Sequence, residues 1–154
     1  VYQVTINFFI YLQAVAGFLV LPFAKNIYRL PLKALWKLCA KFLGVGGAIL
    51  TVGLPLVYLA SNHLYQFNHE INVFLIGGLY VLPTFANIPI IYKLIGLKKE
   101  RTVLYISLFG AAINLVCSYF LIQNYGLIGG LLGSAVAKWF VLPIYSIQVR
   151  NGEK

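Results

Sequence analysis

A single lysine lies in the middle of an apolar stretch near the C-terminus. Lys138 is flanked on both sides by mainly apolar sequence between positions 127 and 149, which is long enough to cross a bilayer. A cation at that depth costs about 2.5–3.5 kcal/mol on insertion scales, so its ammonium group should face a bundle interior or a watery cavity. This position predicts binding of an anion, either a substrate or an acidic group elsewhere in the protein. The alternative is a long side chain that extends to the membrane interface.

Prolines and an asparagine form a second group inside the apolar stretches. Pro55, Pro83, Pro89 and Pro143 each remove a backbone donor, which kinks or breaks a helix. Transporters use such interruptions as hinges, although proline is also common in membrane helices without this role. Because Asn87 lies between Pro83 and Pro89, we favour a functional kink there and include Asn87 among the candidate substrate-binding residues.

Catalytic and metal-binding patterns are sparse. His63, His69 and Glu70 lie close together in the sequence, but their spacing matches no standard zinc site. The three acidic residues are all glutamates, and each falls at or beyond the end of an apolar stretch. Acid–base dyads and carboxylate-held magnesium are therefore not expected. We expect no metal and no cofactor, and a transport pathway rather than an enzyme.

The composition places these residues in a membrane protein. The chain has 154 residues, of which 61% are hydrophobic and 10% charged, with a mean hydropathy of +0.87. Soluble domains carry about 25% charged residues. The net charge of +9 is therefore attributed to basic residues that flank membrane spans, and not to a nucleic-acid-binding site. Apolar runs predict five transmembrane helices, at about 4–24, 42–60, 71–92, 102–122 and 127–149.

These runs are apolar all round and lack the alternation of a membrane β-barrel. The predicted fold class is therefore all-α, a polytopic transmembrane helical bundle over residues 1–150 with a short tail at 151–154. Lysines and arginines gather between the first and second runs, between the third and fourth, and in the tail, whereas the other two loops have none. By the positive-inside rule the N-terminus lies outside and the C-terminus in the cytoplasm. Five spans with the N-terminus outside are what we expect for one portion of a larger helical bundle.

A basic segment precedes the second run. Arg29, Lys33, Lys37 and Lys41 recur every four residues, which places them along one helical face. One interpretation is an amphipathic helix over about 28–42 that lies on the anionic cytoplasmic leaflet. The other is an ordinary basic loop that continues into the next span.

Glycines are concentrated before the last run. Gly126, Gly129, Gly130 and Gly133 contain two overlapping GxxxG spacings, which permit close approach of two helices. We expect them to pack helices within the chain rather than to form a dimer, because a polytopic bundle supplies neighbouring helices.

The stretch from Gly110 to Trp139 resembles a known family. Asn114-Leu115, the Tyr125-Gly126 turn and the small residues of Gly129–Ala137 are similar to the C-terminal region of polysaccharide flippases. These belong to the multidrug/oligosaccharidyl-lipid/polysaccharide exporter superfamily. The resemblance adds Asn114 to the candidate substrate-binding residues.

The resemblance implies two helical bundles that open alternately to each face of a bacterial or archaeal cytoplasmic membrane. The substrate would be an undecaprenyl-pyrophosphate-linked glycan, with Lys138 attracting its phosphates. Implied partners are the lipid bilayer, an N-terminal half of the same chain that precedes this sequence, and other proteins of envelope-glycan assembly, but no nucleic acid.

Three alternatives remain open at this point. A drug or cation exporter of the same superfamily would have similar helices, but a cationic cargo favours a buried carboxylate where this chain has Lys138. A membrane-embedded glycan polymerase or ligase would need a large outer loop, and the predicted outer loops are short. A helical anchor without transport activity would require no polar site at all.

Overall fold

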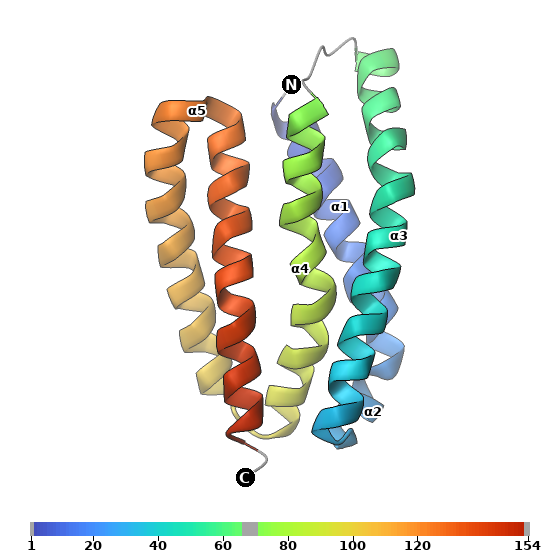
Figure 1. Ribbon diagram of the computed structural model, residues 1–154, viewed down its shortest axis with the longest axis vertical. Helices are drawn as coiled ribbons and strands as arrows, with labels where there is room; N and C mark the ends of the chain where they lie inside the picture. The colour runs from blue at the N-terminus through green and yellow to red at the C-terminus, as the bar shows by residue number, and fades with distance from the viewer. Residues whose placement is uncertain (1, 66–70, 153–154) are drawn as a thin grey trace.

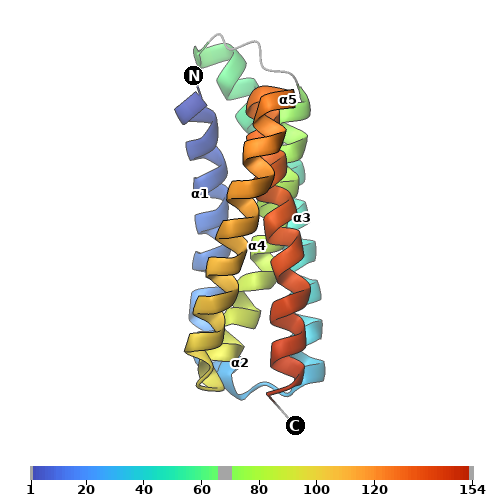
Figure 2. The ribbon, with the colours of Figure 1, turned by 90° about the vertical axis from the view of Figure 1, so that its left-hand side faces the viewer.

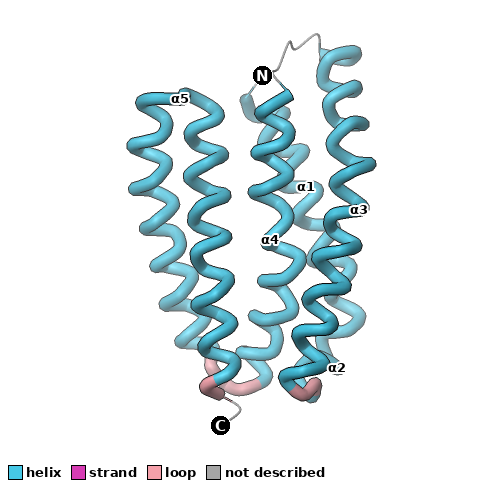
Figure 3. The backbone as a smooth tube through the Cα atoms, viewed as in Figure 1, coloured by secondary structure: helices cyan, strands magenta, loops and turns pink. Residues whose placement is uncertain are grey.

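A computed structural model describes residues 2–65 and 71–152, and over these ranges the chain is helical, with no strand. The elements, in chain order, are α1 (Tyr2–Val20), the 3-10 turn η1 (Leu21–Phe23), α2 (Ala24–Arg29), α3 (Leu32–Tyr65), α4 (Ile71–Gly96) and α5 (Glu100–Arg150) (Figures 1 and 3). Within the described residues, five segments are long and apolar enough to cross a membrane, namely Ile6–Arg29, Leu32–Ser61, Ile71–Gly96, Glu100–Gly126 and Ile128–Arg150. The prediction of an all-α bundle with five spans is confirmed.

α5 is a helical hairpin. Its backbone leaves helical geometry at Gly126, where φ is 56° and ψ is −129°. This conformation is accessible to glycine but strained for residues with a side chain. The chain therefore reverses direction at the predicted Tyr125-Gly126 turn, and the two limbs run side by side (Figure 1). We call residues 100–125 the first limb and residues 128–150 the second limb.

α4 is the central helix of the bundle. It packs against α1, α2 and α3 on one side and against both limbs of α5 on the other, as Figures 1 and 2 show together. Its buried residues include two glycines, and a side chain at Gly77 or Gly78 would collide with Phe9 of α1 or Leu54 of α3. Small residues on α4 thus allow close approach of its neighbours, which is how membrane helices associate in the absence of a strong hydrophobic driving force.

The structure corrects the expected helix boundaries around the basic segment. The first span continues through η1 to Arg29, and the break falls at Leu30, whose ψ of 134° is extended. Pro31 explains it, since proline disfavours helical geometry in the residue before it. The expected amphipathic helix over 28–42 is therefore wrong as a separate element, because α3 starts at Leu32 and runs unbroken to Tyr65.

The basic residues of this segment remain on the surface, as the spacing predicts. Arg29 ends α2, while Lys33, Lys37 and Lys41 lie on α3, and all four are exposed. The opposite side of the same turns is buried in the bundle, at Leu35, Cys39 and Phe42. The segment is thus an amphipathic helical stretch that continues directly into the next span, and its position on the cytoplasmic leaflet stays a prediction.

The prolines do not interrupt their helices. Pro55 lies inside α3, Pro83 and Pro89 inside α4, and Pro143 inside the second limb, and the helix continues past each of them. Of the two expected outcomes, a kink or a break, a break is not seen at these positions in the described residues, and a kink stays a prediction. Membrane helices tolerate the lost hydrogen bond because neighbouring groups and small local adjustments satisfy the freed carbonyl. The proposed hinge role stays a prediction.

The bundle has two chemically different ends. The α2–α3 break, the α4–α5 turn and the C-terminus lie at one end, and α1 begins near the Gly126 turn at the other (Figure 1). The first of these ends carries most of the lysines and arginines, and we call it the basic end. The assignment of the basic end to the cytoplasm remains the prediction of the positive-inside rule.

Candidate functional site

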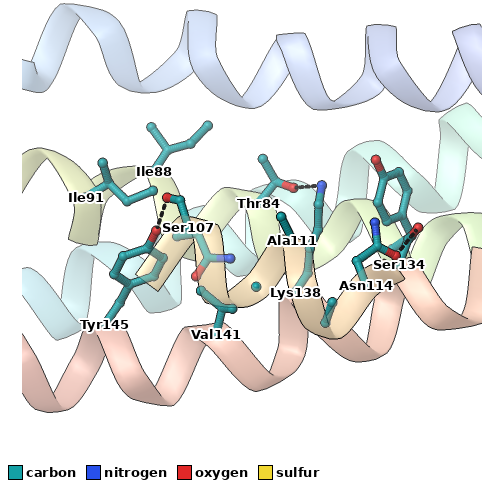
Figure 4. A pocket seen from close by; sticks show the side chains of 14 residues that line it. Thr84, Ile88, Ile91, Ser107, Ala111, Asn114, Ser134, Lys138, Val141 and Tyr145 are labelled. Atoms are coloured by element: carbon teal, nitrogen blue, oxygen red, sulfur yellow. Dashed lines mark hydrogen bonds between the residues drawn. The ribbon is translucent and has the colours of Figure 1, made fainter. Parts of the chain in front are cut away.

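Three helical faces line an open-sided cavity of about 350 Å³ between α4 and the two limbs of α5. Each helix contributes residues at three- and four-residue spacing, so each presents a single face to the cavity. We call this space the polar cavity. Its lining consists of Tyr80, Thr84, Asn87, Ile88 and Ile91 of α4, Ser107, Gly110, Ala111 and Asn114 of the first limb, and Ser134, Ala137, Lys138, Val141 and Tyr145 of the second (Figure 4).

The three candidate substrate-binding residues therefore lie at one site. Lys138, Asn114 and Asn87 come from three different helical segments, and all of them line the polar cavity. The volume falls within the range of about 300–1,000 Å³ that is usual for small-molecule pockets.

Lys138 reaches from the second limb toward α4. Its Nζ lies 3.1 Å from the Thr84 hydroxyl oxygen, to which it donates a hydrogen bond (Figure 4). The same nitrogen lies 3.9 Å from the centroid of the Tyr80 ring, a cation–π contact. Among the described residues no carboxylate contacts Lys138, and the one described acidic residue, Glu100, lies at the start of α5. The positive charge is thus solvated by a hydroxyl and a ring rather than neutralised.

Asn114 connects the two limbs of the hairpin. Its Oδ1 accepts a hydrogen bond from Ser134 of the second limb at 2.9 Å (Figure 4). The same oxygen accepts a second hydrogen bond, from Ser118 of its own limb, at 3.0 Å. The carbonyl is thereby oriented, and its donor group is available to the cavity. Asn114 therefore acts both as a hydrogen-bonded bridge and as part of the cavity wall.

Asn87 is the least satisfied polar side chain of the site. It is buried, with 9% of its surface exposed, and its Oδ1 has no hydrogen-bond partner among the residues that the structure describes. A buried acceptor without a donor costs about 1–3 kcal/mol. Asn87 lines the polar cavity through its other atoms, because the oxygen itself has almost no accessible surface.

The part of the polar cavity nearer the basic end holds a pair of hydroxyl groups. The Ser107 hydroxyl and the Tyr145 hydroxyl lie 2.8 Å apart across the two limbs (Figure 4). Each hydroxyl can both donate and accept, so the pair can also contact a polar ligand. The cavity thus carries a cation near its middle and neutral hydrogen-bonding groups on either side.

Two of the four glycines hold the limbs together beside this site. A Cβ at Gly129 would collide with the backbone carbonyl of Leu121, and one at Gly133 would lie 2.7 Å from the backbone nitrogen of Ser118. Gly130 has only ordinary contacts, with its nearest neighbour 3.5 Å away, and Gly126 has open space around it. Close packing within the hairpin therefore depends on Gly129 and Gly133, while Gly126 permits the turn.

A basic residue with a structural role was missed at the sequence level. Lys93 was counted among the loop cations, but it lies in α4 with only 5% of its surface exposed. Its Nζ donates to the carbonyl oxygens of Leu30 at 2.6 Å and Tyr28 at 3.4 Å. These carbonyls lie where α2 ends before Pro31, so Lys93 satisfies acceptors that the helix break leaves free.

Sequence reasoning also missed the hydroxyl groups that complete the cavity. Thr84 is four residues after Tyr80, Ser107 is seven before Asn114, and Tyr145 is seven after Lys138. Polar residues at these intervals share a helical face, a signal that could have identified them. Nothing in the spacing indicates which of these faces meet.

The remaining expectation for the site concerns metal ions. The described residues contain no group of three or more histidine, cysteine, aspartate or glutamate side chains that could hold a metal ion, while His69 and Glu70 lie outside the described residues.

Comparisons with protein families, curated proteins and solved structures give no match to this chain. The resemblance to polysaccharide flippases therefore stays a prediction, and function is argued from the polar cavity alone.

Proposed function

We propose that this chain is part of a transporter that moves a lipid-linked glycan across a membrane and binds its phosphates at Lys138. The observation that carries the proposal is an intramembrane lysine that lines a cavity without a carboxylate partner among the described residues. Removing this positive charge from water costs free energy, and another interaction must offset that cost. An anionic substrate does so, because charges attract more strongly in a medium of low dielectric constant.

The geometry around Lys138 supports an anion rather than a cation as cargo. An ammonium group has three donors, and the Thr84 hydroxyl and Tyr80 ring take up two directions. A third donor remains for a phosphate oxygen. A cationic drug would meet electrostatic repulsion at the same place, which is why the exporter of cationic compounds is the weaker candidate.

The neutral polar groups support a ligand that also carries donors. The Ser107–Tyr145 pair offers hydroxyls at 2.8 Å from each other, and the Asn114 side chain lines the same cavity. A sugar attached to a phosphate presents hydroxyl groups next to the negative charge. A glycan phosphate would therefore contact Lys138 and these neutral groups together, whereas an inorganic anion would contact Lys138 alone.

Complementation tests this proposal. The full-length protein is expressed in cells that lack a lipid-linked glycan flippase, and surface glycan is measured across a panel of glycan types. We expect restoration of export with at least one glycan, and loss of that export in Lys138→Met, which keeps the length of the side chain but removes its charge.

A matched control separates the cavity from general effects of charge. Lys37→Met removes one exposed cation from the basic segment of α3 and leaves its neighbours in place, so it should export normally. Equal export by Lys138→Met and Lys37→Met at matched protein levels would contradict the proposal. Export of cationic dyes instead of glycan would favour the multidrug exporter.

A further inference from the structure

A second cavity adjoins the polar cavity on the side away from the basic end. It has a volume of about 330 Å³ and is lined by Ile6, Phe9, Tyr80, Ile122, Gly126, Gly130, Leu131 and Ser134. Gly126 marks the turn of the α5 hairpin, so this second cavity extends to the end of the bundle opposite the basic end (Figure 1). Tyr80 and Ser134 line both cavities, and the two spaces therefore meet at these side chains.

Both boundary residues are held by groups of the polar cavity. The Ser134 hydroxyl donates to Asn114 at 2.9 Å, and the Tyr80 ring is held by the ammonium group of Lys138 at 3.9 Å. Tyr80 belongs to α4 and Lys138 to the second limb, so their contact ties the two elements together beside the boundary. The charge proposed to bind substrate is thus the same charge that holds the ring.

We propose that Tyr80 is a gate between the two cavities, kept closed by Lys138 and released when an anion binds there. The inference rests on the proposed function, because it requires an anionic ligand at Lys138. An ammonium group that has paired with an anion attracts an aromatic ring less, since much of its field is cancelled. Binding of the phosphates would then free the Tyr80 ring and connect the polar cavity to the opposite end of the bundle.

Thermodynamic linkage predicts the direction in which anion affinity changes when the Tyr80 ring is removed, and this direction differs between a gate and a residue that binds the ligand. If the anion and the ring compete for Lys138, removal of the ring must strengthen anion binding by the energy of the lost contact. A desolvated cation–π contact is worth about 2 kcal/mol, which corresponds to an affinity gain of up to about 30-fold. If Tyr80 instead stacks on the substrate or helps to bind it, its removal must weaken binding.

The first experiment measures binding of inorganic pyrophosphate to the purified full-length protein by calorimetry. We expect Tyr80→Leu to bind up to about 30-fold more tightly than the unaltered protein, and Tyr80→Phe, which keeps the ring, to bind with unchanged affinity. Should Tyr80→Leu not accumulate, Tyr80→Met removes the ring with a more flexible side chain. Weaker or unchanged binding in the ring-less variants would overturn the gate.

A second experiment measures the connection between the cavities directly. Ala137→Cys places a thiol in the polar cavity, in a background in which the native Cys39 and Cys117 are alanine. A membrane-impermeant thiol reagent is added on the side of the Gly126 turn. We expect pyrophosphate to accelerate labelling, and Tyr80→Leu to give fast labelling without it. A labelling rate that neither change affects would overturn the gate.

The two experiments also separate this inference from the function on which it rests. Binding of pyrophosphate that is lost in Lys138→Met, together with unchanged labelling and no gain in Tyr80→Leu, would leave the proposed function standing and remove the gate. Absence of any Lys138-dependent binding would overturn both.

Discussion

Gly129→Ala and Gly130→Ala make the same chemical change at adjacent positions, yet the structure predicts opposite effects on stability. A Cβ at Gly130 meets only the Ile122 side chain, at 3.5 Å, which is an ordinary contact. A Cβ at Gly129 meets the backbone carbonyl of Leu121 on the other limb, and backbone cannot rotate away as a side chain can. The first variant fits the existing hairpin, whereas the second must push its limbs apart.

The size of the difference follows from two terms. Replacing glycine by alanine within a helix gains about 0.5–1 kcal/mol because alanine loses less backbone entropy on folding. This gain applies to both positions and cancels in the comparison. Overpacking a close contact costs about 1–3 kcal/mol and applies to Gly129 alone. Gly129→Ala should therefore be less stable than Gly130→Ala by about 1–3 kcal/mol.

The assay is reversible unfolding in mixed detergent micelles, followed by the loss of helical circular dichroism. Gly133→Ala should behave like Gly129→Ala, because its Cβ would lie 2.7 Å from the Ser118 nitrogen on the first limb. Equal stabilities for Gly129→Ala and Gly130→Ala would refute the packing argument. A change in oligomeric state without a change in subunit stability would instead indicate that these glycines mediate dimerisation.

Two further predictions concern single hydrogen-bonding groups. Lys93→Met should lower the stability of the protein by about 1.5–3 kcal/mol, the range for hydrogen bonds to charged groups, because the carbonyls of Leu30 and Tyr28 lose their donor. The exposed Lys25→Met serves as the control in the same unfolding assay, and an equal loss in both variants would contradict the role of Lys93. Asn114→Leu removes the acceptor shared by Ser118 and Ser134 and should cost about 0.6–1.7 kcal/mol, as interhelical hydrogen bonds in membranes do. No measurable loss would mean that these hydroxyls find other acceptors.

Helix content and the order of the spans were accessible from the sequence because they depend on local properties. A run of about 20 apolar residues without the alternation of a β-barrel is helical in a membrane, since a helix satisfies all of its backbone hydrogen bonds internally. The turn at Gly126 was predictable for the same kind of reason, as it falls between two such runs. The helix boundary at Leu30 also has a local cause, because Pro31 disfavours helical geometry in the residue before it.

The sequence by itself therefore determined an all-α membrane bundle, its hairpin turn and the presence of a lysine in the middle of an apolar run. Only the tertiary structure decided that Lys138, Asn114 and Asn87 line one cavity, and that Tyr80 lies between this cavity and a second one. It also decided that Lys93 is buried against the end of α2. Periodicity shows which residues share a face of their own helix, but the pairing of faces depends on contacts between segments far apart in the chain. Glycines on α4 permit its close approach to α1 and α3, and glycines on α5 permit the close approach of its two limbs.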